Sequence, residues 1–143
     1  MASKAPAPPT EAELRELVLH GETLRQQLGA LEQQRDLLVD LSGDARRSLS
    51  ALEALAAAKE GDEMLVPLGA GAFVHARLAH AGRAIASLGA GLHAEMPVED
   101  ARQRLQGRVE SLDAAAAQLT RDLQRVLDEL QRVNAVVESA YGG

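Results

Sequence analysis

Aromatic side chains are almost missing from this sequence, which has one Phe (Phe73), one Tyr (Tyr141) and no Trp among 143 residues. Aromatic and branched residues normally fill the centre of a compact globule. Ala and Leu dominate instead, in a chain that is 46% hydrophobic and has the size of one domain. Small residues and Leu suit narrow seams between helices, so we expect a mainly α protein rather than one with a wide core.

Three further absences exclude whole classes of protein. Cysteine is absent, which excludes a disulfide framework or a thiolate metal site and is compatible with a reducing cytosol. The net charge of -6 comes from interleaved charges with no basic run, which argues against binding to nucleic acid or to an anionic membrane. No apolar run approaches the roughly 18 residues that span a bilayer, and the first ten residues lack a signal-peptide core. We expect a soluble, cytoplasmic protein.

The N-terminal part of the chain predicts a flexible leader followed by a long coiled-coil helix. Residues 1–9 hold three prolines and small residues, a composition that cannot offset its ordering entropy. One domain is expected over residues 10–143, and Thr10 with Glu13 forms a capping-box pattern at its start. Over residues 10–60 apolar positions alternate at spacings of three and four, as in a coiled-coil seam. The seam is Leu14, Leu17, Gly21, Leu24, Leu28, Leu31, Arg35, Leu38, Ser42, Ala45, Leu49 and Leu52.

The C-terminal part, residues 98–141, predicts a second coiled-coil helix that begins after Pro97 with the acidic residues Glu99 and Asp100. Its seam is Val98, Arg102, Leu105, Val109, Leu112, Ala116, Leu119, Leu123, Val126, Leu130, Val133, Val137 and Ala140. At 1.5 Å per residue both helices would extend about 60 Å. Matched lengths on either side of a short insert favour an antiparallel two-helix coiled coil.

Residues 63–97 form a glycine-rich insert that predicts two β-hairpins. The string Leu-Gly-Ala-Gly occurs at 68–71 and again at 88–91, and glycines permit the positive φ values of tight hairpin turns. We expect strands at 64–68, 72–78, 83–88 and 92–96, with Pro67 at an edge or a bulge. Four such short strands cannot form a self-sufficient sheet, and their edges need protection. We therefore expect an oligomer assembled through this insert.

No residue pattern predicts an enzyme, a metal site or a cofactor. The four histidines, His20, His75, His80 and His93, lack carboxylate or thiolate partners at a recognisable spacing, although His75 and His93 could in principle face each other across strands. The Gly-Ala-Gly strings lack the Lys-Ser/Thr ending and the strand-to-helix context of phosphate loops. No serine has a recognisable His/Asp constellation.

The free ends of the two helices carry more apolar residues than one seam can bury. Val18 and Leu19 in the first helix, and Val136 and Tyr141 in the second, are surplus to the seam. Two interpretations stay open. These residues are either ordinary end packing with scattered exposed apolar side chains, or an adhesive, frayable tip for apolar partners.

The order of long helix, paired hairpins and long helix resembles the prefoldin family. The segment that opens the insert, Glu63 to Gly71, reads Glu-Met-Leu-Val-Pro-Leu-Gly-Ala-Gly, and Leu88 to Gly91 closes its second hairpin. Two hairpins rather than one make the chain similar to the α-type subunit, and the resemblance covers roughly residues 10–140. The chain departs from the family pattern in two ways. The segment Ala84 to Leu88 is poorer in large hydrophobic residues than such a strand usually is, and His75 and His93 stand where strand residues are usually apolar or charged.

The resemblance implies an ATP-independent co-chaperone subunit in a hexamer of two α-type and four β-type subunits. Its hairpins would join in an intersubunit β-barrel, and its coiled-coil tips would capture non-native polypeptides and pass them to a group II chaperonin. The residues implied for assembly are Leu65, Val66, Leu68, Phe73, Val74, Leu78, Ile85, Leu88 and Leu92. The residues implied for client contact are Leu14, Leu17, Val18, Leu19, Val133, Val136, Val137 and Tyr141. The alternative is a structural coiled-coil tether that binds no client.

Overall fold

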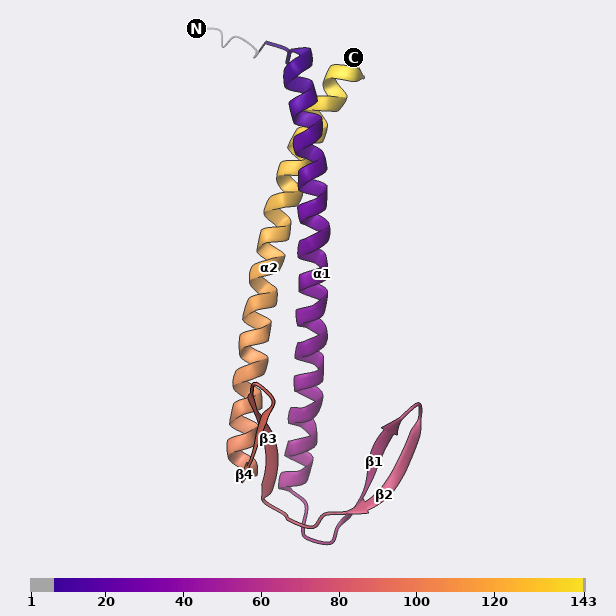
Figure 1. Ribbon diagram of the computed structural model, residues 1–143, viewed down its shortest axis with the longest axis vertical. Coiled ribbons are helices and arrows are strands. Elements are labelled where there is room, and N and C mark those ends of the chain that lie inside the picture. Colours follow the sequence, from indigo (N-terminus) through magenta and orange to yellow (C-terminus); the bar gives the residue numbers. More distant parts are fainter. Residues whose placement is uncertain (1–6, 143) are drawn as a thin grey trace. The chain divides into compact units, whose positions relative to one another are not determined.

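Two long helices and two antiparallel β-hairpins make up the protein in a computed structural model that describes residues 7–142 (Figure 1). The elements are α1 (Glu11–Ala56), β1 (Glu63–Gly69), β2 (Ala72–Arg77), β3 (Arg83–Gly89), β4 (Leu92–Pro97) and α2 (Val98–Tyr141). The expected mainly α fold with a small β insert is confirmed. Of the expected leader, residues 1–6 lie outside the described residues, and residues 7–9 have no regular secondary structure.

The chain divides into two compact units. Unit 1 consists of Met1–Val39 with Ala114–Gly143, and unit 2 is Asp40–Asp113. Each unit therefore contains a portion of both helices, and unit 2 also contains both hairpins. No helix in the described part of the chain is long and apolar enough to cross a membrane.

Helix α1 begins with the expected capping box and ends earlier than expected. The backbone N–H of Thr10 donates to Glu13 Oε2 at 2.9 Å, and the N–H of Glu13 donates to Thr10 Oγ1 at 3.2 Å. The helix ends at Ala56, not at residue 60, because the next residues form a turn. In this turn the N–H of Lys59 donates to Asp62 Oδ2, and Gly61 has a φ of 85° that continues no helix.

The expected seams are the buried faces of the helices. Every seam position of α1 is buried or half-buried, and in α2 only Ala140 is exposed. In unit 1, Leu24 packs with Leu130 and Val133 to form the most buried cluster. Gly21 is buried beside this cluster, and a Cβ atom added to it would lie 3.5 Å from Val133 Cγ1. Small and apolar seam residues thus let the two helices pack closely in unit 1.

In unit 2 the seam contains a polar contact. Ser42 is buried, and its hydroxyl donates to Asp113 Oδ1 at 2.6 Å. The guanidinium of Arg46 pairs with the other oxygen of the same carboxylate. Ser42 interrupts the apolar pattern without leaving an unsatisfied polar atom, because this cross-helix hydrogen bond satisfies it.

The two hairpins repeat each other with an offset of twenty residues. In the first, Val66 lies opposite Val74, and in the second Ala86 lies opposite Ala94. The register shifts between Pro67 and Gly69 and, in the same way, between Ser87 and Gly89. All four strands lie within one residue of the expected positions. The duplicated string therefore encodes a duplicated structure.

Each hairpin turn has two central residues with positive φ, which is the backbone of a type I′ turn. Ala70 has a φ of 51° and Gly71 a φ of 79°, and Ala90 and Gly91 repeat these values at 52° and 76°. Glycine adopts this conformation without cost, whereas alanine is strained there. The strings were correctly interpreted as hairpin turns.

Candidate functional site

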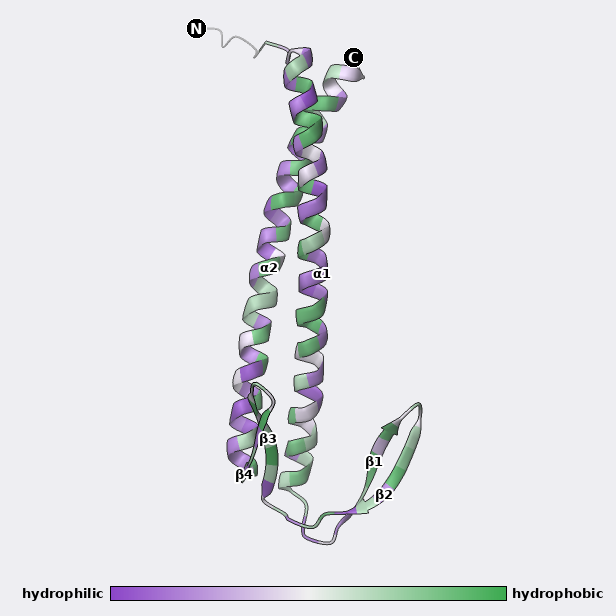
Figure 2. Cartoon of the chain, viewed as in Figure 1, coloured by the Kyte–Doolittle hydropathy of each residue, from purple (hydrophilic) through white to green (hydrophobic). Residues whose placement is uncertain are grey.

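The β1–β2 hairpin exposes apolar side chains on both faces. Figure 2 shows that hydrophobic residues predominate in this hairpin. Residues directly opposite each other share a face, so Phe73 lies beside Pro67 on one face and Val74 beside Val66 on the other. Phe73 is 60% exposed and Leu68 is 68% exposed. In the described part of the chain this sheet has two strands, so both of its edges are unpaired. A sheet of this size with both faces open has marginal stability by itself.

The β3–β4 hairpin differs because one of its faces is half-buried. Ala84, Ala86, Ala94 and Met96 lie on that face, and Ile85 on the opposite face is 75% exposed. The sequence showed the segment Ala84 to Leu88 to be poor in large hydrophobic residues for such a strand. In the structure, Ala84 and Ala86 are among the residues that line a pocket together with residues of α1 and α2.

Eight of the nine residues expected to serve assembly are exposed. They are Leu65, Val66, Leu68, Phe73, Val74, Ile85, Leu88 and Leu92. The ninth, Leu78, is half-buried in the connection between the hairpins. Its N–H donates to the carbonyl of Asp62 at 3.0 Å, and its carbonyl accepts from the N–H of Gly61 at 2.8 Å. Leu78 therefore joins the ends of the first hairpin rather than contributing to its free surface.

The eight residues expected at the tips divide into two groups, all within unit 1. Four are packed or half-buried in the seam: Leu14, Leu17, Val133 and Val137. The other four, Val18, Leu19, Val136 and Tyr141, are exposed. They are the same four residues that the heptad pattern left surplus, and Leu19 and Tyr141 are more than 60% exposed. An exposed apolar set thus lies close to the residues at which α1 begins and α2 ends.

Polar side chains also connect the helices in unit 1. His20 Nε2 lies 2.9 Å from Glu129 Oε1, and Arg25 Nη2 donates to Asn134 Oδ1 at 3.1 Å. Both contacts are exposed, where such pairs contribute little to stability. These contacts bear on the register of the two helices more than on their stability.

In unit 2 the ionised form of Asp113 is favoured. The hydrogen bond from the Ser42 hydroxyl, and then the charge of Arg46, lower the pKa of the Asp113 carboxyl below its ordinary value of 3.8. At neutral pH the ionised carboxylate of Asp113, with Ser42 and Arg46 as its two partners, therefore connects the two helices.

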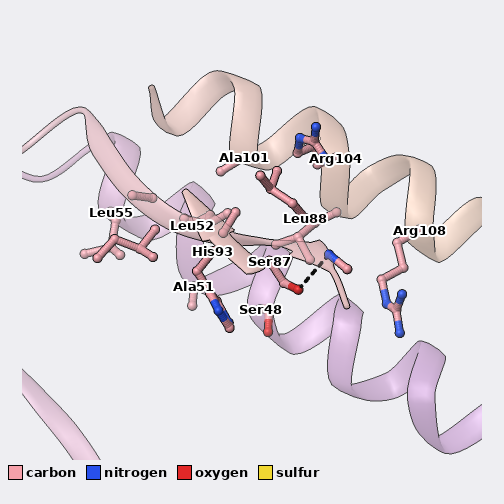
Figure 3. Close-up of a pocket in the computed structure, with 15 residues that line it drawn as sticks. Ser48, Ala51, Leu52, Leu55, Ser87, Leu88, His93, Ala101, Arg104 and Arg108 are labelled. Atoms are coloured by element: carbon pink, nitrogen blue, oxygen red, sulfur yellow. Dashed lines mark hydrogen bonds between the residues drawn. The ribbon is translucent and has the colours of Figure 1, made fainter. Parts of the chain in front are cut away.

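A pocket of about 870 Å³ in unit 2 was not anticipated from the sequence (Figure 3). Residues near the end of α1, strand β3 and the first turns of α2 line it. Its aliphatic lining includes Leu52, Leu55 and Leu105, and its charged lining consists of Arg104 and Arg108. The pocket exists only because the β3–β4 hairpin lies against both helices, and periodicity along one segment does not predict that packing.

Two exposed apolar residues of α1 were also missed. Leu37 and Val39 flank the seam residue Leu38 and are both more than half exposed. The signal was present, because a run of three large apolar residues on a helix cannot all face one seam.

The histidines do not form a metal site in the described residues. His75 and His93 lie on separate two-stranded sheets, where they face Leu65 and Ser87, so the idea that they oppose each other is wrong. Within residues 7–142 no three His, Cys, Asp or Glu side chains are grouped closely enough to hold an ion.

Comparisons with known proteins agree with this architecture. The family model described as "Prefoldin subunit" matches residues 24–143. A protein named "Prefoldin subunit alpha" from Methanocorpusculum labreanum is 30% identical over 99% of this chain and 96% of its own length. Another of that name, from Methanococcoides burtonii, is 32% identical over 92% of this chain and 87% of its own length.

The fold also matches a solved structure. The cryo-EM structure of filamentous PFD from Methanocaldococcus jannaschii superposes with a TM-score of 0.53 at 24% identity. The match covers 85% of this chain and 95% of that one. With a family model that spans most of the sequence, two relatives that match along most of their length and this shared fold, the chain belongs to the prefoldin subunit family, whose members are chaperone subunits.

Proposed function

We propose that this chain is an α-like subunit of an ATP-independent chaperone and that it assembles through its hairpins with β-type subunits. The observation that carries the proposal is the β1–β2 hairpin, whose apolar side chains are exposed on both faces and whose edges are unpaired within the described residues. Partner strands at these edges would complete the backbone hydrogen bonding and bury Phe73 and Leu68. The proposed product is a hexamer of two α-type and four β-type subunits around a shared β-barrel.

The proposed client site is the exposed set Val18, Leu19, Val136 and Tyr141. Non-native polypeptides expose apolar segments, and these side chains offer apolar surface that folding of this chain does not use. Each contact would be weak. Several arms of one assembly would act on the same client, so that avidity replaces single-site affinity.

Adaptability of the helix ends supports binding to unrelated clients. Gly21 and Gly29 lie within α1 in unit 1, and each weakens the helix by about 1 kcal/mol relative to Ala. Local opening of such a segment lets one surface fit different sequences. We propose that a bound client is then transferred to a group II chaperonin, without covalent chemistry or nucleotide.

Native mass spectrometry of the chain alone, and then mixed with a β-type prefoldin subunit, tests the assembly step. The expected result is a mixed complex of two α-like and four β-type chains. If the chain stays monomeric in the mixture at micromolar concentration, the assembly proposal is wrong.

The competing function is a structural tether that binds no client. A tether shares the two helices, but it gives no reason for a duplicated hairpin insert with free apolar faces. An aggregation-suppression assay without nucleotide separates the two functions. A tether leaves the light scattering of a denatured client unchanged, whereas a chaperone subunit in its complex lowers it.

A further inference from the structure

The pocket of unit 2 is bordered by the edge of strand β3 rather than by one of its faces. Six consecutive β3 residues, Ala84 to Gly89, line it, whereas β4 contributes only His93. A strand face would contribute alternate residues, because successive side chains point to opposite sides of a sheet. In the described part of the chain β3 pairs with β4 alone, so backbone N–H and C=O groups of its other edge are available at the pocket.

The charge of the pocket is of one sign. Arg104 and Arg108 line it and no Asp or Glu does, in a chain whose net charge is -6. Neither guanidinium makes an ion pair within residues 7–142, whereas Arg102 on the same helix turn pairs with Glu99. Figure 3 shows Arg104 and Arg108 on α2, Leu88 of β3 near Arg104, and Leu52 and Leu55 on α1.

We propose that this pocket receives an edge strand of a partner subunit that carries two carboxylates two residues apart, and that Arg104 and Arg108 bind these carboxylates. This inference rests on the proposed assembly function and specifies the partner that the hairpin accepts. The free β3 edge supplies main-chain hydrogen bonds, the aliphatic lining accepts apolar side chains, and the arginines select for acidic ones. The exposed backbone edge favours a polypeptide over a small amphipathic anion.

The spacing of the two arginines sets the spacing of the carboxylates. Residues four apart on a helix are separated by about 6 Å along its axis. Residues two apart on a strand point to the same side and are separated by about 6.6 Å. A strand with acidic residues at alternate positions therefore matches Arg104 and Arg108, one carboxylate to each guanidinium.

The strands of this chain do not have that pattern. Within residues 7–142 the acidic strand residues are Glu63 in β1 and Glu95 in β4, one in each of these strands. Both already lie near arginines of their own hairpins, since Glu63 is 3.5 Å from Arg77 and Glu95 is 3.5 Å from Arg83. The pocket is thus suited to a different subunit rather than to a second copy of this chain.

Fluorescence anisotropy with the full-length protein tests the inference. The probes are two labelled heptapeptides, TVEVEVT and its neutral counterpart TVQVQVT, titrated at low ionic strength. Because two exposed ion pairs are at stake, the acidic peptide is expected to bind about three- to tenfold more tightly. The variant R104Q/R108Q is expected to bind the two peptides with equal affinity. In wild type, added salt is expected to reduce the difference between the affinities for the two peptides. A version of the acidic peptide with N-methyl groups on alternate amides binds more weakly, because it cannot pair with the β3 edge.

A matched variant and a fourth peptide complete the design. R121Q/R125Q removes two arginines at the same spacing on α2 within unit 1, and it keeps the preference for the acidic peptide. A labelled peptide of residues 60–68, an acidic and aliphatic segment that includes most of β1, is expected to bind more weakly than TVEVEVT. Equally tight binding of that peptide would identify a second copy as the occupant and overturn the heterotypic partner.

The inference is also overturned if neither peptide binds, if both bind wild type equally, or if the preference survives in R104Q/R108Q. Circular dichroism verifies that both double variants keep their helix content, as expected for Arg to Gln changes on exposed helix surface. If wild type assembles with a β-type subunit but does not prefer the acidic peptide, this inference alone is wrong. If wild type prefers the acidic peptide but forms no mixed assembly, the proposed function alone is wrong.

Discussion

Asp113 is the residue whose charge bears most directly on the packing of the two helices in unit 2. Its carboxylate accepts from Ser42 and pairs with Arg46; the hydrogen bond is stronger to the ionised form, and the ion pair requires it. The pKa of this carboxyl is lowered in the folded protein relative to its ordinary value of 3.8. The ionised group therefore contributes stability above the unfolded pKa, and that contribution is lost as the pH falls through the folded pKa.

We predict that D113N has a lower free energy of unfolding than wild type at pH 7. The difference in free energy between the two proteins narrows as the pH falls below about 4. Urea unfolding followed by circular dichroism across this range measures both curves. D40N, which makes the same change on α1, serves as the control. Parallel curves for wild type and D113N would show that the Asp113 carboxylate has no such role.

Gly21 is the second residue with a clear energetic consequence. It is buried in the seam of unit 1, yet a Cβ atom there would meet Val133 Cγ1 at 3.5 Å, an ordinary van der Waals contact. We predict that G21A raises the free energy of unfolding by about 1 kcal/mol, because alanine restricts the unfolded chain and fits the space. Thermal and urea unfolding measure the change.

G29A is the matched control, since a Cβ at Gly29 would meet nothing within 4 Å. It should give a similar gain from helix propensity alone. Destabilisation by G21A but not by G29A would mean that the helices need the closer approach that only glycine permits.

At the level of elements, each of the two hairpin turns contains backbone strain at an alanine. Ala70 and Ala90 adopt positive φ, which asparagine tolerates better than alanine. We predict that A70N and A90N each stabilise their hairpin by about 0.5–1 kcal/mol. Slower amide hydrogen exchange in β1 to β4 is the measurement.

A72N is the control for the turns, because Ala72 lies in strand β2 with an ordinary φ. It should give no gain, since asparagine is disfavoured in strands. Equal protection in A72N and A70N would mean that the turn conformation does not limit hairpin stability.

The elements were predictable because their signals are local. A spacing of three and four residues identified the seams, and the repeated Leu-Gly-Ala-Gly strings identified the turns of both hairpins. The end of α1 at Ala56 was missed because the turn that follows is closed by Asp62 and by the carbonyl of Leu78, a residue far along the chain. The pocket was missed for the same reason, since Arg104 and β3 meet only through tertiary packing.

At the scale of the whole molecule, the proposed assembly and client surfaces belong to different units. The hairpins lie in unit 2, and the exposed tip residues lie in unit 1. Deleting residues 1–20 and 131–143 would remove the proposed client surface, but it would also remove Val133 from the cluster that buries Leu24 and Leu130. Point substitutions at exposed positions separate client contact from folding, because they leave this cluster intact.

The most direct test of the account is therefore the variant V18Q/L19Q/V136Q/Y141Q, assembled with a β-type subunit and assayed for suppression of aggregation of a guanidinium-denatured model enzyme. L37Q/V39Q, which removes two equally exposed apolar residues of α1 away from the helix ends, is the control. We predict that several-fold more of the tip variant is needed for the same suppression, with the native mass of its complex unchanged and the control variant unaffected. Full suppression by a correctly assembled tip variant would contradict it.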